Sequence, residues 1–83
     1  MNITEKVFEG YKTRLKAYAK HERGDFAELL THIQDETKRA HNTIWALYVY
    51  DMVTLEAVNY MDDAIEDYKR MFIEQAIDER EGK

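Results

Sequence analysis

The 83-residue sequence contains no cysteine, no serine and no proline, and it has only three glycines. Without cysteine there are no disulfides, thiolate metal sites or thiol nucleophiles, and the composition fits a reducing compartment. Without serine a Ser-His-Asp arrangement is impossible, and isolated glycines do not form phosphate-binding loops. These absences exclude several classes of enzyme and leave a chain in which helix-forming residues dominate.

Long hydrophobic runs are also absent. The longest apolar run covers residues 44–50, far short of the roughly 20 residues that a helix needs to cross a bilayer. The first residues lack the apolar segment of a signal peptide. We therefore expect a soluble, cytoplasmic protein that does not contact membranes.

Charge is distributed unevenly along the chain, which has a formal net charge of −5. Residues 1–24 hold six bases and three acids, a balance of +3, whereas residues 25–83 hold six bases and fourteen acids, a balance of −8. Affinity for nucleic acid depends on Lys and Arg side chains that neutralise phosphates. The acidic balance thus argues against direct binding to DNA or RNA.

The first helix is expected over residues 3–22. Asn2 and Glu5 have the spacing of a capping box, in which the second residue reaches back to the first. Gly10 lies inside this helix and suggests the close approach of another element. Apolar residues recur every three or four positions and define one stripe, which consists of Ile3, Val7, Tyr11, Leu15 and Tyr18.

A first break is expected at residues 23–25. Gly24 can end a helix in the left-handed conformation. Asp25 and Glu28 repeat the capping pattern and can begin the next helix. The helical pattern then continues to about residue 80, on a stripe that includes Phe26, Leu30, Ile33, Thr37, Ala40, Ile44, Leu47, Val58, Met61, Ile65, Tyr68 and Phe72.

The position of a second break is left open by the sequence. Asn42 can cap a new helix, which predicts helices over about 25–41 and 43–80. Two polar residues, Asp51 and Thr54, interrupt the stripe, so that either the helix breaks near 51–54 or a long helix runs through with its middle in a different environment. We expect a single all-α domain over residues 1–83, a three-helix bundle, and the sequence does not decide between a break at 42, a break at 51–54 and no break.

Residues 44–50 are apolar on every side of a helix, and a second stripe adds Trp45, Tyr48, Met52 and Leu55. A chain of this size buries only about 60–65% of its unfolded surface, so burying all of them in one copy is difficult. The segment has three possible interpretations: the central helix of the bundle, a buried strand, or an interface rich in the aromatic residues typical of binding hot spots. We expect an interface, in a homodimer whose 44–55 segments pack across a two-fold axis.

The third helix also carries an acidic surface, formed by Glu56, Asp62, Asp63, Glu66 and Asp67. These acids can pair with the bases of the first helix, within one subunit or between two. They can instead imitate the phosphates of DNA and inhibit a nucleic-acid-binding protein. A third interpretation is a Mg²⁺ site. Some all-α nucleotide pyrophosphohydrolases, which this chain resembles only in carboxylate spacing, hold Mg²⁺ with two carboxylate pairs, and Asp63 with Glu66 supplies just one.

His32 and Glu36 are four residues apart and could face one metal ion, with His41 further along the helix. Helical metal sites need three or four convergent ligands, often from Glu-x-x-His segments, and this sequence has none. We therefore expect no metal and no cofactor.

The sequence favours a non-enzymatic function. We expect a small acidic helical module that binds itself and another protein, acting as an adaptor or as a regulator or inhibitor of a larger protein. Such chains are frequent among bacterial and phage accessory genes. The alternatives are a DNA-mimic inhibitor and a Mg²⁺-dependent nucleotide hydrolase that uses the carboxylates of residues 56–67.

Overall fold

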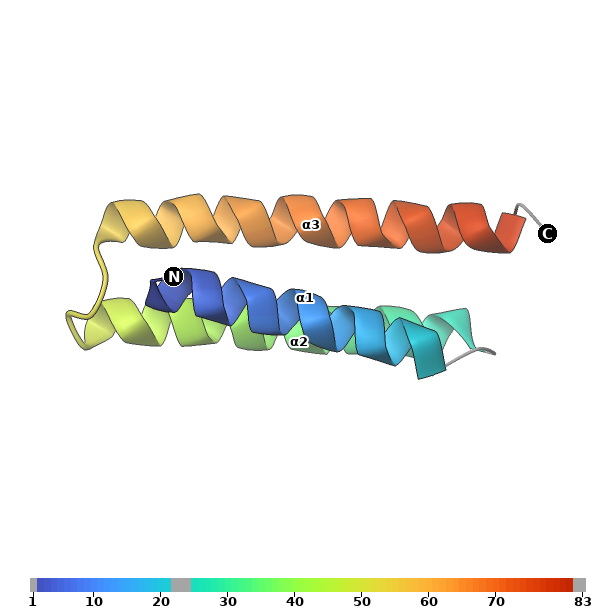
Figure 1. Cartoon of the computed structure of the whole chain (residues 1–83), viewed down its shortest axis with the longest axis horizontal. Coiled ribbons are helices and arrows are strands. Elements are labelled where there is room, and N and C mark those ends of the chain that lie inside the picture. The colour runs from blue at the N-terminus through green and yellow to red at the C-terminus, as the bar shows by residue number, and fades with distance from the viewer. Residues whose placement is uncertain (1, 22–24, 82–83) are drawn as a thin grey trace.

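The computed structural model describes residues 2–21 and 25–81, which form three helices packed against one another (Figure 1). They are α1 (Ile3–His21), α2 (Phe26–Val49) and α3 (Leu55–Glu81). α1 and α3 run in one direction and α2 runs in the other. The described residues contain no strand, so the all-α, three-helix prediction is confirmed and the strand alternative for residues 44–50 is wrong.

Asn2 and Asp25 cap the starts of α1 and α2, as the sequence predicts. The backbone N–H of Glu5 donates to Oδ1 of Asn2 at 2.9 Å. The side-chain Nδ2 of Asn2 donates to Oε1 of Glu5 at 3.2 Å. Glu5 thus reaches the side chain of the cap and not its backbone. At the second helix, the N–H of Ala27 donates to Oδ1 of Asp25 at 2.9 Å. Gly24 lies outside the described residues.

The predicted boundary between helices at residues 41–43 is wrong. α2 continues through Asn42 to Val49, and the expected helix over 43–80 is divided. Ala40 and Ile44, on either side of Asn42, are both buried in the core. A break at Asn42 would disturb both contacts, while the Asn42 side chain itself is exposed.

The chain reverses at residues 50–54, the alternative position that the sequence indicated. The N–H of Asp51 donates to the carbonyl of Tyr48 at 2.9 Å, and the N–H of Met52 donates to the carbonyl of Leu47 at 2.9 Å. This pair of hydrogen bonds is a Schellman motif, which places its penultimate residue in the left-handed conformation. Asp51 occupies that position with φ 61°.

Thr54 begins the third helix. Its Oγ1 accepts the backbone N–H of Ala57 at 3.1 Å, and its carbonyl accepts the N–H of Val58 at 3.1 Å. The two polar residues that interrupt the apolar stripe therefore have complementary roles, because Asp51 ends α2 and Thr54 caps α3.

The core lies along the axis of the bundle, and each helix contributes apolar side chains to it. Its buried hydrophobic members are Tyr11, Leu15, Leu29, Ile33, Ala40, Ile44, Val58, Met61 and Ile65. In α1 the stripe is shifted from the prediction at its start, since Thr4 is buried and Ile3 is exposed. Gly10 approaches no other helix, because a Cβ there would meet only Arg14 of the same helix.

One polar contact is buried within this core. The Tyr11 hydroxyl lies 2.7 Å from Oγ1 of Thr37, which itself donates to the carbonyl of Ile33 at 2.6 Å. Thr37 has a single hydroxyl hydrogen, so Tyr11 is the donor in the first bond. Burial raises the pKa of Tyr11, and the bond links α1 to α2 at one register.

α1 stops short of one end of the bundle. Counting back along the antiparallel pair from Tyr11, opposite Thr37, places Ile3 level with Trp45. The last turn of α2, the connection at 50–54 and the first turn of α3 extend past the start of α1 (Figure 1). This end of the molecule is consequently a hairpin of two helices that the third does not cover.

Candidate protein-binding site

Large hydrophobic side chains lie at the end of the bundle where α2 and α3 extend past the start of α1. We call this set the apolar end, and it comprises Trp45, Tyr48, Val49, Tyr50, Met52 and Leu55, all of which are exposed. Val49 and Tyr50 are 73% and 77% exposed. The structure thus brings the four predicted interface residues to one end of the hairpin. It adds Val49 and Tyr50, which the apolar run over 44–50 already contained.

Trp45 is fixed in place although it is exposed. Its ring meets the ring of Tyr48 edge to face, with centroids 5.8 Å apart and planes at 87°. Its indole N–H donates to Oδ2 of Asp62 at 2.8 Å. An aromatic side chain that is held before a partner arrives loses little further freedom on binding.

Asp62, whose carboxylate accepts the Trp45 indole N–H, also contacts His41. Nδ1 of His41 lies 2.7 Å from Oδ1 of Asp62, and Nε2 lies 2.7 Å from Oε2 of Glu66. Both ring nitrogens face carboxylate oxygens, an arrangement that favours the doubly protonated imidazolium, in which both nitrogens donate. Burial lowers the pKa of His41, but the hydrogen bonds and charges of Glu66 and Asp62 outweigh it and raise the pKa above 6.5.

The predicted acidic surface is therefore divided between two sides of α3. Asp62 and Glu66 contact His41 of α2, although Glu66 is itself exposed, as are Glu56, Asp63 and Asp67. In the part of the chain that the structure describes, no ion pair within one copy joins these acids to the bases of α1.

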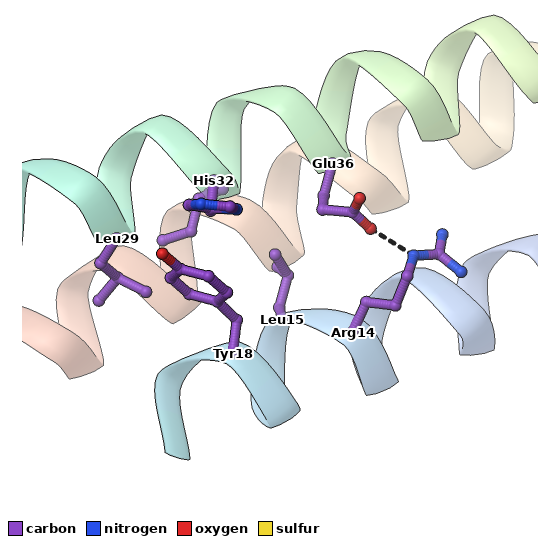
Figure 2. A pocket seen from close by; sticks show the side chains of 7 residues that line it. Arg14, Leu15, Tyr18, Leu29, His32 and Glu36 are labelled. Carbon is purple, nitrogen blue, oxygen red and sulfur yellow. Dashed lines mark hydrogen bonds and ion pairs between the residues drawn. The ribbon is translucent and has the colours of Figure 1, made fainter. Parts of the chain in front are cut away.

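The ion pair that α1 forms with another helix runs from Arg14 to Glu36 of α2. These two residues border a pocket of about 200 Å³ between α1 and α2. Figure 2 shows the ring of His32 lying flat against that of Tyr18, with centroids 3.8 Å apart. The pocket is lined by Arg14, Leu15, Tyr18, Leu29, His32, Ile33 and Glu36.

The candidate metal residues do not converge. His32 stacks on Tyr18, Glu36 pairs with Arg14, and His41 faces Asp62 and Glu66 on α3. Over residues 2–21 and 25–81 there is no group of three or more His, Asp or Glu side chains that could hold a metal ion.

No helix in the described ranges has the length and apolar character needed to cross a bilayer. Comparison with protein-family models, with curated proteins and with solved structures finds no match to this chain.

Proposed function

We propose that this chain is a small protein-binding module that acts as an adaptor or as a regulator of a larger protein, and that the apolar end is its binding surface. The observation that carries the proposal is the gathering of six large, exposed hydrophobic side chains at one end of the α2–α3 hairpin. Large contiguous apolar patches on the surface of a folded protein often mark interaction sites.

The order of Trp45 supports the same proposal. Its indole is held by Asp62 and by the ring of Tyr48. Tryptophan and tyrosine are enriched among the residues that contribute most to binding free energy. Trp45 is accordingly the anchor of the surface, and the exposed side chains beyond it complete the contact.

Self-association is a second candidate, because two copies could cover their apolar ends across a two-fold axis. Light scattering over a hundredfold dilution series tests it. A mass of twice 9.9 kDa that falls in Trp45→Ala or Tyr48→Ala variants supports the dimer. A mass of 9.9 kDa at all concentrations leaves the apolar end to a different protein.

The remaining functional alternatives have no specific observation in their favour. Asp62 and Glu66 are turned toward His41, which reduces the row of outward charges that a DNA mimic needs. The same contact engages Glu66, one of the two residues of the suggested Mg²⁺ pair.

Site-specific photo-cross-linking in cells tests the proposed function. A photoreactive amino acid replaces Tyr50 at the apolar end or, as the control, the exposed Gln75 of α3. We expect a discrete protein adduct from position 50 that is lost when Val49→Ser is added, and none from position 75. Equal labelling from both positions, or no adduct from position 50, contradicts the proposal.

A further inference from the structure

Two contacts between α1 and α2 border the pocket that lies between these helices. Arg14 of α1 pairs with Glu36 of α2. One turn away, the ring of Tyr18 stacks on that of His32, with centroids 3.8 Å apart and planes at 25° (Figure 2). The pocket has a volume of about 200 Å³ and is lined by both pairs, so an ion pair and a pair of aromatic rings form part of its wall.

The pocket also reaches the hydrophobic core. Its other lining residues are Leu15, Leu29 and Ile33, which are all core members and at most 6% exposed. An apolar cavity of about 150 Å³ lined by aliphatic and aromatic side chains can hold benzene, whereas drug-sized ligands occupy about 300–1,000 Å³. The volume and the lining of the pocket therefore favour a molecule with a single ring.

The charged groups at the pocket are already paired with one another. Oε2 of Glu36 accepts from Arg14, and its Oε1 lies 3.3 Å from Nη1 of Arg39. Among the described residues, every buried side-chain nitrogen or oxygen has a hydrogen-bond partner. A charged ligand would have to break the ion pair or lose its hydration without compensation, which an uncharged ligand avoids.

We propose that this pocket binds small, uncharged aromatic compounds with one ring, for which phenol is the probe. The three core side chains remove the ring from water, and the stacked rings of Tyr18 and His32 offer it an aromatic contact. The inference goes beyond the proposed function and does not depend on it. The pocket is formed by α1 and the first half of α2, whereas the apolar end lies where α2 ends and α3 begins.

An NMR titration with four probes at neutral pH tests the proposal. Phenol, cyclohexanol, benzoate and benzylamine share a six-membered ring and differ in planarity or charge. We expect phenol to shift the side-chain signals of Tyr18 and His32 and to bind about threefold more tightly than cyclohexanol, which makes no aromatic contact. Benzoate and benzylamine are expected to bind at least about tenfold more weakly than phenol, because burial of an unpaired charge is costly.

Two variants and a control locate the binding site. Leu29→Phe adds a ring to the lining of the pocket and is expected to abolish the phenol shifts. His32→Ala removes one of the stacked rings and is expected to weaken phenol about threefold, whereas Gln34→Ala, at an exposed position of α2 outside the pocket, should leave the affinity unchanged. The emission of Trp45, the only tryptophan, shows whether each variant keeps the fold.

Three results would overturn the inference. Equal binding of all four probes would mean that the pocket does not select uncharged aromatic compounds. Shifts at the Trp45 indole in place of Tyr18 and His32 would assign phenol to the apolar end. No shift with phenol at millimolar concentration would mean that the pocket holds no such ligand. None of these results changes the cross-linking from position 50, which tests the proposed function separately.

Discussion

His41 and Asp62 are joined across the α2–α3 interface by a hydrogen bond of 2.7 Å between Nδ1 and Oδ1. The second oxygen of the same carboxylate accepts the indole N–H of Trp45 at 2.8 Å. A partly buried histidine and an exposed tryptophan therefore share one carboxylate, and the orientation of Trp45 depends on the contact between the helices.

The free energy of unfolding is expected to fall as pH rises through the pKa of His41. Burial lowers this pKa, and the contacts with Glu66 and Asp62 raise it by more, to above 6.5. Because the pKa is higher in the folded state, the contribution is complete below pH 6.5 and is lost above the folded pKa. Urea unfolding at pH values from about 5.5 to 9 measures this decline.

The His41→Gln variant is the control for this pH dependence. Glutamine keeps one hydrogen bond but does not titrate, so the variant is expected to be less stable at pH 6 by about 1 kcal/mol and to lose the decline between pH 6.5 and the folded pKa of His41. A variant whose stability falls with pH as steeply as that of the natural chain would show that His41 is not responsible.

The hydrogen bond between the Tyr11 and Thr37 hydroxyls is expected to make mutation of the two residues unequally destabilising. Tyr11→Phe leaves Thr37 bonded to the Ile33 carbonyl and should cost about 1 kcal/mol. Thr37→Val leaves the Tyr11 hydroxyl buried without an acceptor and should cost about 2 kcal/mol. Urea denaturation of both variants measures the difference.

The double variant, Tyr11→Phe with Thr37→Val, completes the cycle. It removes both polar groups at once, so its loss of stability should be smaller than the sum of the two single losses. Strictly additive losses would mean that the two hydroxyls do not interact in solution.

Replacing Asp51 by glycine is expected to stabilise the fold by about 1 kcal/mol, because Asp51 has a positive φ of 61° that glycine adopts without steric cost. Asp51→Ala removes the same charge but keeps a Cβ, and it should bring no gain. Thermal unfolding of the two variants compares them. An equal gain in both would assign the effect to charge and not to the backbone.

Gly10→Ala is expected to stabilise α1 by about 0.5–1 kcal/mol, since glycine inside a helix is unfavourable relative to alanine. The new Cβ would lie 3.1 Å from Nη1 of Arg14, the far end of a flexible side chain that can move. Thermal unfolding should show the larger gain in an Arg14→Ala background. A loss of stability in that background would show that a group other than Arg14 opposes the new Cβ.

The number of helices and most core positions follow from local spacing in the sequence, although Leu29 is buried where the stripe predicted Leu30. The choice of the second break does not follow from it. Asn42 is a suitable cap, and a cap contributes about 1 kcal/mol. Ending α2 there would endanger the burial of Ile44, which contributes about 1.5–3 kcal/mol. Asp51 and Thr54 provide a chain reversal without that loss, so tertiary packing decides the boundary.

The network beneath Trp45 was not predicted, because its residues are far apart in the sequence. His41 lies 21 residues from Asp62 and 25 from Glu66. Periodicity indicates which face of a helix is buried, but it does not give the register of one helix against another. The exposed residues of the apolar end were easier to find, since a run that is apolar on every side is visible in the sequence alone.

The most direct test of the apolar end is an NMR titration of the ¹⁵N-labelled chain with the protein that cross-links to position 50. We predict shift changes concentrated at residues 45–56 and at the indole N–H of Trp45, with little change around the pocket at Arg14 and His32. Changes centred on that pocket, or spread evenly over the three helices, would contradict the assignment of the binding surface to the uncovered end of the hairpin.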